Sequence, residues 1–376
     1  MIGTSEITVR PAAKKDTIAI ADVLRNEGLS LPPAANVQLV TDHWERLWDK
    51  NPYYQELDAD VFYGWVMEQD EKIVGFFGYL PRVYFLNQKK ITVYIASNWG
   101  VLKPYRRFTY LLCNAFFNSF PQQLKLTTTA ITPTGKIFTM FKGKKFPDAE
   151  LNQAYVIPFK LEKLLRIKLS TAPVLYTIAK PFLQLLNFVM PVAFQCRFFW
   201  KKQVVQQINS EELPADFEEF WQSYLQQSNG LLASRSLQTM QWVYADVKKE
   251  NRKRIFLYRS KESNQILGYA SLILEPVVTS PDMKRYKIGD LLALNEQVKK
   301  EIIQQLISYS FFDGADLLEV HLVSTLTRNE IPSINFVRTT PAFPVYYHTA
   351  DKELEQLLSK KENWHFTPYD GDTILG

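Results

Sequence analysis

The chain has 376 residues, which is too long for one ordinary domain and long enough for two. Hydrophobic residues make up 46% and aromatic residues 14%, which excludes an intrinsically disordered protein and leaves apolar side chains for two cores. The formal net charge of +5 is modest for nucleic-acid binding, so we expect no nucleic acid partner. It is compatible with a small anionic ligand, or with solvated lysines that keep the protein soluble.

The cysteine content argues against a disulfide framework. Only Cys113 and Cys196 are present, and their spacing predicts neither a disulfide nor a zinc site. We therefore expect no metal and a reducing, cytoplasmic location. Residues 1–10 lack the basic start and apolar core of a secretory signal, so we expect no export.

One apolar stretch, from Phe182 to Trp200, raises the question of a membrane segment. Polar residues and Pro191 interrupt it over the roughly 20 residues that a membrane span needs. We interpret it as a buried linker helix. A helix lying on a membrane surface, and hence a peripheral membrane contact, is the alternative.

The first half of the chain alternates between strand and helix patterns. Residues Glu6–Arg10 predict a strand, and apolar residues at helical spacing within Pro11–Glu27 predict a helix. The next predicted elements are a helical segment at His43–Trp48, a hairpin of Val61–Met67 and Lys72–Leu80, a strand at Ile91–Val101, a basic turn at Lys103–Arg107, a helix at Tyr110–Phe120 and a strand at Leu124–Ile131.

The second half repeats this order. Gln265–Tyr269 in its hairpin echoes Lys72–Phe76 in the first hairpin. Its predicted elements are helices at Phe217–Leu225 and Ser236–Val243, a hairpin of Arg254–Tyr258 and Gln265–Leu274, a strand at Tyr286–Leu292, a helix at Glu296–Phe311 and a strand at Leu317–Val323. These patterns predict a first domain at residues 1–160, a hydrophobic and basic connector at 161–207, and a second domain at 208–376.

The segment Val101–Leu112, with the sequence VLKPYRRFTYLL, combines a strand end, a proline, a Tyr-Arg pair and the start of a helix. This segment and the order of elements resemble the GNAT acyltransferase fold. The resemblance implies an α/β (α+β) protein with two GNAT-like domains in tandem, each a mixed, mostly antiparallel sheet flanked by helices. It further implies an N-acyltransferase that uses acyl-CoA as a co-substrate.

The resemblance also implies where the coenzyme binds. Unpaired backbone N–H groups and the positive end of a helix dipole can cradle a pyrophosphate, and Arg106 and Arg107 would add charge-assisted contacts. The preceding strand would leave backbone donors for the pantetheine arm. The implied coenzyme-binding residues are Trp99, Val101, Leu102, Arg106, Arg107, Phe108, Thr109 and Tyr110.

The sequence departs from the family pattern at three places. Larger residues, among them Thr109 and Leu111, replace the small residues expected after the arginine. The segment Thr134–Phe146 resembles the closing helix of the family and the residues that follow it. In the family a tyrosine of this segment often protonates the departing thiolate, but this sequence has Phe141 at that position. The turn Ala293–Asn295 in the second half has neither arginine nor glycine, so we expect no second coenzyme site.

An amine acceptor must lose a proton, which favours a base with a pKa near neutrality. His321 follows Glu319 at strand spacing, and Asp290 lies on the strand expected beside them. These three residues are the predicted base and orienting carboxylates. A hydrogen-bonded structural histidine in a polar seam is the alternative.

Other histidines and tyrosines are weaker candidates for the chemistry. His348 is a second candidate base, while Tyr346 and Tyr347 could supply a general acid or line the acceptor pocket. His43 and His365 lie in aromatic surroundings and are expected to be packed. No nucleophile elbow is present, which favours direct transfer without a covalent enzyme intermediate.

The C-terminal run Trp364–Thr373 resembles tails of tandem GNAT proteins. Tandem GNAT proteins and the related Fem-type transferases bind substrates between their halves. The leading hypothesis is the transfer of an acyl group, either acetyl or long-chain fatty acyl, to the amine of a peptide or small molecule. The apolar connector, with Phe198–Trp200, favours a long acyl chain and a role in lipidation. One alternative is a Fem-type transferase that uses aminoacyl-tRNA. The other is a GNAT-fold binding protein without catalysis.

Overall fold

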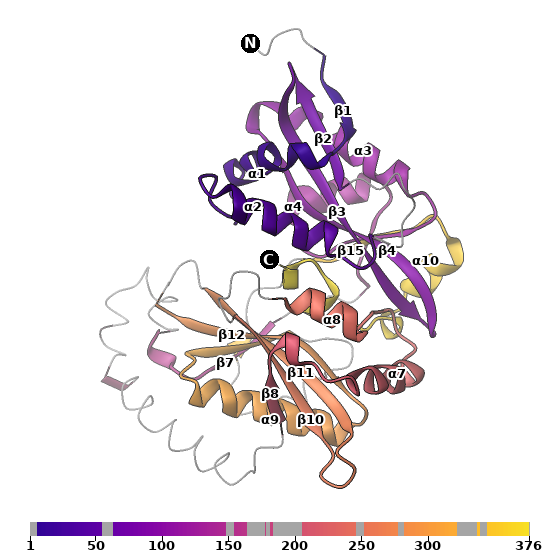
Figure 1. Cartoon of the computed structure of the whole chain (residues 1–376). Coiled ribbons are helices and arrows are strands. Elements are labelled where there is room, and N and C mark those ends of the chain that lie inside the picture. Colours follow the sequence, from indigo (N-terminus) through magenta and orange to yellow (C-terminus); the bar gives the residue numbers. More distant parts are fainter. Residues whose placement is uncertain are drawn as a thin grey trace.

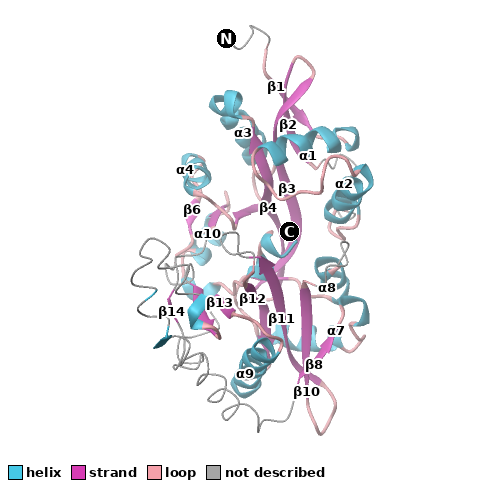
Figure 2. Cartoon of the chain, turned by 90° about the vertical axis from the view of Figure 1, so that its left-hand side faces the viewer, coloured by secondary structure: helices cyan, strands magenta, loops and turns pink. Residues whose placement is uncertain are grey.

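Two β-sheets, each flanked by helices, make up the protein (Figure 1). The computed structural model describes residues 6–54, 63–147, 154–163, 177, 181–182, 205–245, 252–276, 282–321, 337–338 and 344–375. Figures 1 and 2 both place the C-terminal end at the junction between the two sheets. Most of the predicted connector, including the apolar stretch after Phe182, lies outside the described residues.

The elements of the first half follow the predicted order. They are β1 (Thr8–Pro11), α1 (Thr17–Asn26), α2 (Val37–Trp44), β2 (Gly64–Gln69), β3 (Lys72–Leu86), β4 (Lys89–Val101), a 3₁₀ helix at Lys103–Phe108, α3 (Thr109–Ser119), β5 (Leu124–Thr127), α4 (Thr132–Met140), β6 (Lys144–Lys145) and β7 (Ala154–Pro158). The strand predicted at Leu124–Ile131 is present as β5 but ends at Thr127, the last residue that pairs with a neighbouring strand.

The second half also follows the predicted order. Its elements are β8 (Val205–Ile208), α7 (Phe217–Gln227), β9 (Leu232–Ala233), α8 (Leu237–Tyr244), β10 (Lys253–Arg259), β11 (Ile266–Pro276), β12 (Lys284–Ala293), α9 (Glu296–Phe312), β13 (Leu317–His321), β14 (Val337–Arg338), β15 (Tyr346–His348), α10 (Lys352–Leu358) and short 3₁₀ turns at Pro368–Asp370 and Thr373–Leu375.

The two sheets exchange strands. The first has the order β1-β2-β3-β4-β5-β15-β6, with β9 on β3, and the second has the order β14-β7-β13-β12-β11-β10-β8. Strand β15 therefore joins the first sheet from the C-terminal part of the chain, and β7, from residues 154–158, joins the second. Only the β4–β5 and β12–β13 pairs of named strands are parallel in the part of the chain described. The boundaries at residues 160 and 208 stay a prediction.

Helices cover both faces of the first sheet. Along β3, Phe76 packs against Trp44 and Trp48 beside α2, whereas its neighbour Phe77 packs against Phe116 of α3. This alternation follows from the two-residue period of a strand. Figure 2 accordingly shows α1 and α2 on one side of the strands and α3 and α4 on the other.

The second sheet is also buried on both faces. Phe256 of β10 belongs to a cluster with residues of α9, while its neighbours Ile255 and Leu257 belong to a larger cluster that reaches into the first sheet. One apolar cluster therefore extends from the first sheet to the second, and a separate cluster lies between the second sheet and α9. No helix among the described residues is long and apolar enough to span a bilayer.

Candidate functional site

Strand β4 diverges from β5 at a β-bulge. Residues Val93–Ile95 pair with Leu124–Leu126, but no described strand pairs with this edge of β4 beyond Ile95. On the other edge, Phe77 lies opposite Trp99 and Gly78 opposite Ser97, which leaves Asn98 as the extra residue. Asn98 has a φ of 52°, in the left-handed region that asparagine tolerates. The divergence leaves backbone groups of β4 available to a ligand.

The second sheet contains a comparable divergence. Arg285–Lys287 of β12 pair in parallel with Leu317–Glu319 of β13, and β12 then continues to Ala293. Its extra residue is Gly289, where a Cβ would come within 2.8 Å of Ser271 Oγ. Both parallel strand pairs thus end close to a bulge.

The basic turn follows directly after the first divergence. It forms a 3₁₀ helix, Lys103–Phe108, that leads into α3. The Arg106 side chain is 60% exposed, with Nη2 donating to Glu27 Oε2 at 2.5 Å. The Arg107 guanidinium lies 4.6 Å from the centre of the Phe108 ring. Two cations therefore stand at the N-terminus of α3, where the helix dipole already favours an anion.

All eight predicted coenzyme-binding residues lie in one continuous segment, from the end of β4 to the first turn of α3. Val101 is buried, Trp99 is half-buried against Phe77, and Tyr110 is exposed. The N–H of Leu102 donates to the carbonyl oxygen of Val74, at 2.9 Å, so it is already used. Their role in coenzyme binding stays a prediction.

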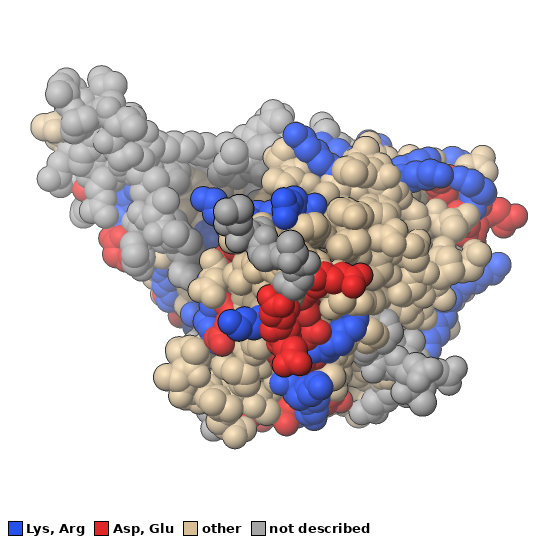
Figure 3. All heavy atoms as spheres, turned by 90° about the horizontal axis from the view of Figure 1, so that it is seen from above, with Lys and Arg blue, Asp and Glu red and all other residues tan. Residues whose placement is uncertain are grey.

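One face of the molecule carries charges of both signs. In the view from above, basic and acidic side chains lie side by side, and no continuous basic surface covers the described part of this face (Figure 3). Because nucleic-acid binding rests on contacts with many phosphates, this face lacks the charge pattern typical of a nucleic-acid-binding surface.

The three predicted catalytic residues lie on adjacent strands of the second sheet. Glu319 of β13 lies opposite Lys287 of β12, and its Oε2 is 3.3 Å from Arg285 Nη1. Asp290 lies further along β12 and is fully buried. The side chain of His321 lies outside the described part of the structure. Their catalytic role stays a prediction.

Asp290 belongs to a buried ionic network that the sequence did not reveal. Its carboxylate accepts from Arg235 Nε and Nη2, at 3.0 and 3.1 Å, and from Thr367 Oγ1 at 2.8 Å. It also accepts from the Tyr269 hydroxyl. Arg235 donates in addition to Asp370, which is also fully buried. Burial by itself would raise the pKa of Asp370, but the charge and hydrogen bonds of Arg235 outweigh it and hold this pKa below its usual value.

A second carboxylate, Asp372, lies at the first divergence. Its Oδ1 accepts from the Thr128 hydroxyl at 2.7 Å, one residue after the end of β5. Burial raises the pKa of Asp372, although the hydroxyls of Thr128, Ser97 and Thr129 oppose this shift. Nothing in the sequence pattern indicates this contact between residues 244 positions apart.

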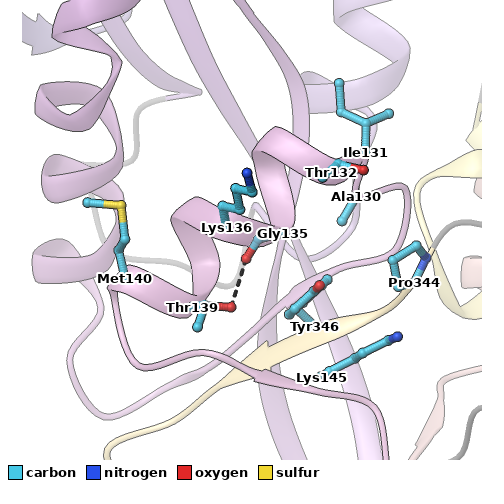
Figure 4. A pocket seen from close by; sticks show the side chains of 10 residues that line it. All are labelled: Ala130, Ile131, Thr132, Gly135, Lys136, Thr139, Met140, Lys145, Pro344 and Tyr346. Carbon is cyan, nitrogen blue, oxygen red and sulfur yellow. Dashed lines mark hydrogen bonds between the residues drawn. The ribbon is translucent and has the colours of Figure 1, made fainter.

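A cavity of about 920 Å³ lies between α4 and the strands β6 and β15 (Figure 4). Figure 4 shows the Tyr346 side chain pointing from β15 toward Gly135 of α4. Tyr346 therefore lines a cavity, and the predictions that it supplies a general acid or lines the acceptor pocket stay predictions. The lining residues are Ala130, Ile131, Thr132, Gly135, Lys136, Thr139, Met140, Lys145, Pro344 and Tyr346.

Beside this cavity, aromatic side chains fill the space between α3 and α4. Phe141 stacks on Phe117 with ring centres 4.5 Å apart, so the position of the expected tyrosine holds a partly buried phenylalanine that packs against the core. His348 lies edge-on to Phe117 at 5.1 Å, and burial lowers its pKa. Lys125 donates to the carbonyl oxygen of Phe120 at the end of α3, and burial lowers the pKa of this lysine to about 8.

Comparison with known proteins shows what the fold resembles. No protein-family model matches the chain, and no curated protein sequence matches it. Solved structures do match. A GCN5-related N-acetyltransferase from Kribbella flavida matches with a TM-score of 0.60 and 10% identity over 93% of this chain and 72% of that chain. One from Anabaena variabilis matches with a TM-score of 0.58 and 10% identity over 92% and 73% of the two chains.

A third structure, a conserved protein of Enterococcus faecalis described as a probable N-acyltransferase, matches with a TM-score of 0.57 and 10% identity, over 92% of this chain and 73% of that chain. The prediction of the fold class is confirmed: the chain is a mixed α/β protein with two mixed sheets flanked by helices, as in these proteins. At this identity the likeness concerns the fold, and one fold supports many functions.

The described residues contain no group of three or more His, Cys, Asp or Glu side chains that could hold a metal ion.

Proposed function

We propose that the protein is an N-acyltransferase that moves an acyl group from a coenzyme A thioester to an amine. The observation that carries the proposal is the divergence of β4 from β5 at Asn98, directly before the basic turn and α3. An acyl-CoA needs a slot for an extended pantetheine arm and a cationic helix N-terminus for its phosphates. The edge of β4 that pairs with no described strand and the basic turn before α3 follow one another in the chain, which supports the proposal.

The phosphates would lie at the N-terminus of α3, with Arg106 and Arg107 as their cationic partners. To bind a phosphate, Arg106 must share its guanidinium between Glu27 and the ligand, and its exposure makes this feasible. The pantetheine arm would follow the free edge of β4 near Trp99 and Val101. Phe108, Thr109 and Tyr110 would border the phosphate end of this site.

Transfer would be direct. The amine nitrogen attacks the thioester carbonyl carbon, and backbone N–H groups at the divergence stabilise the oxyanion that develops on the carbonyl oxygen. The C–S bond then breaks, and the coenzyme leaves as a thiolate. Phe141 cannot protonate this thiolate because it has no hydroxyl group, so the proton must come from another residue.

We propose that the two sheets are two GNAT-like units in tandem, of which only the first binds coenzyme. The side chain of Asn295 already caps α9 by accepting from Val298 N at 2.9 Å, and the turn before α9 carries no arginine. The acceptor amine would then bind between the two units. Residues His321, Glu319 and Asp290 are one set of groups for its deprotonation, although Asp290 is already engaged by Arg235.

Two other functions compete with this proposal. A Fem-type transferase would need aminoacyl-tRNA, and both the modest net charge of +5 and the mixed charge of the face in Figure 3 argue against it. A binding protein without catalysis is favoured by one observation, the packed Phe141 in place of a tyrosine. Such a protein would bind a partner but no acyl-CoA.

Calorimetric binding of the purified chain to coenzyme A thioesters from acetyl to palmitoyl tests the proposal without a known acceptor. We expect saturable binding. Affinity that rises with chain length would indicate a fatty acyl donor, by about 0.8 kcal/mol per buried methylene, and a flat response an acetyl donor. No binding of any thioester would contradict the proposal and favour one of the two competing functions.

A further inference from the structure

Asp372 occupies the point at which β4 and β5 separate. Its Oδ1 accepts from Thr128 Oγ1 at 2.7 Å, and its own N–H donates to the same hydroxyl oxygen at 3.3 Å. Thr128 follows the last residue of β5, and Ser97 on β4, whose hydroxyl also acts on this carboxyl, precedes the bulge at Asn98. The carboxyl group thus lies between the two strand ends.

The C-terminal tail is held firmly in this place. Arg82 of β3 is fully buried, and its Nη1 donates to the carbonyl oxygens of Tyr369 and Gly371 at 2.6 and 3.2 Å. Asp370 is fixed by the buried ion pair with Arg235. A Cβ at Gly371 would come within 2.5 Å of Thr128 Oγ1, so a glycine is required for this close approach. The three residues that precede Asp372 are therefore held by contacts with Arg82, Arg235 and Thr128.

Asp372 differs from the other carboxylates nearby in what it binds. Asp290 and Asp370 are fully buried, and each already has a cationic partner because both accept from Arg235. Asp372 is half-buried, and among the described residues no cation pairs with it. A partly exposed carboxylate held by a neutral hydroxyl keeps its capacity to accept a proton.

We propose that Asp372 is the proton acceptor for the attacking amine at the first divergence, supplied by the tail of the chain. This inference rests on the proposed function. As the C–N bond forms, the amine proton passes to the Asp372 carboxylate, and as the C–S bond breaks, the same proton passes to the departing thiolate. Charge and atoms balance, the carboxylate is regenerated, and no hydroxyl at Phe141 is needed.

Carboxyl labelling locates Asp372 relative to the coenzyme. The native protein is treated with a water-soluble carbodiimide and glycine ethyl ester, with and without saturating acetyl-CoA, and the peptides are quantified by mass spectrometry. We expect Asp372 to be modified in the free protein. Saturating acetyl-CoA should lower the rate of this modification about tenfold or more. Asp351, an exposed carboxylate at the start of α10, should react equally in both samples, and Asp370 should stay unmodified.

Substitution tests the chemical role. Release of free coenzyme A from acetyl-CoA is followed with n-butylamine and with diglycine as acceptors. Asp372→Asn should lower the rate about 100-fold or more, the usual contribution of a general base, and leave the Kd for acetyl-CoA within about twofold. Asp372→Glu should recover part of the rate. Retained coenzyme binding shows that the variants are folded.

The outcomes separate this inference from the proposed function. If wild-type protein does not bind acetyl-CoA, both are overturned. If it binds but the labelling of Asp372 is unaffected by acetyl-CoA, or Asp372→Asn keeps the wild-type rate, only the role of Asp372 is overturned. If neither amine releases coenzyme A in wild-type protein, the labelling experiment alone decides.

Discussion

Arg235 and Asp370 form an ion pair with no solvent exposure, in which Nη1 lies 2.6 Å from Oδ1. Because Arg235 also binds Asp290 of β12, the pair ties the C-terminal tail to the second sheet. The Tyr369 ring lies against two buried guanidinium groups, 4.2 Å from Arg235 and 4.7 Å from Arg82 of the first sheet. The tail thus joins the two halves.

The first prediction concerns the strength of this junction. Asp370→Asn leaves a buried guanidinium with one of its two anionic partners and should lower the free energy of unfolding by about 3–5 kcal/mol. Urea unfolding followed by tryptophan fluorescence measures this. Glu362→Gln, an exposed change of the same kind, should stay within about 0.5 kcal/mol of wild type. Equal effects of the two changes would contradict a structural role for the pair.

A second prediction uses the contact between α4 and β15. A Cβ at Gly135 would lie 2.6 Å from the Tyr346 hydroxyl oxygen and 2.8 Å from two ring carbons. Gly135→Ala should therefore destabilise the protein by about 1–2 kcal/mol, despite the gain in helix propensity. In a Tyr346→Ala background the same change should stabilise the protein by up to about 1 kcal/mol. Thermal unfolding of the wild type and the three variants measures the effect of Gly135→Ala in both backgrounds. If Gly135→Ala has the same sign in both, the contact with Tyr346 does not determine the effect of this substitution.

Acid stability should depend on His365, which is 2% exposed. Burial lowers the pKa of His365 from 6.5 to about 4, so between these values the unfolded chain binds a proton that the folded chain does not. The free energy of unfolding is therefore unaffected by this histidine above pH 6.5. It falls by up to about 3 kcal/mol as the pH is lowered from 6.5 toward 4. His365→Gln should flatten the dependence of unfolding free energy on pH in that window. An unchanged slope would mean that His365 titrates normally in the folded state.

The buried cysteine gives a fourth prediction. Cys113 on α3 has no exposed surface, and burial raises the pKa of its thiol to about 12. Because the thiolate is the reactive form, Cys113 should not react with a disulfide reagent at neutral pH until the protein unfolds. A Cys196→Ser background isolates this thiol. Rapid stoichiometric labelling of the folded variant would show that α3 opens readily.

The elements with strong local patterns could be predicted from the sequence. The hairpin strand predicted at Lys72–Leu80 lies within β3, and the helix predicted at Glu296–Phe311 matches α9 to within one residue. The strand prediction succeeded because a continuous β-rich apolar run follows a polar turn, and the helix prediction succeeded because apolar residues recur at helical spacing. The confirmed fold class follows from the order of such elements.

The exchange of β7 and β15 between the sheets could not be predicted. A strand as short as Tyr346–His348 carries no local signal of its partner, and β5 lies more than 200 residues earlier in the chain. The contacts of Arg235 and Asp372 escaped the sequence for the same reason. A lone charged residue in a polar segment looks solvated until tertiary structure brings a partner to it.

Hydrogen–deuterium exchange with saturating acetyl-CoA tests the central claim most directly, because it reports both binding and its place. We predict slower exchange in residues 96–112, which span the free edge of β4, the basic turn and the start of α3, and unchanged exchange in residues 285–299 at the second divergence. Unchanged exchange in 96–112, or protection confined to 285–299, would contradict the account.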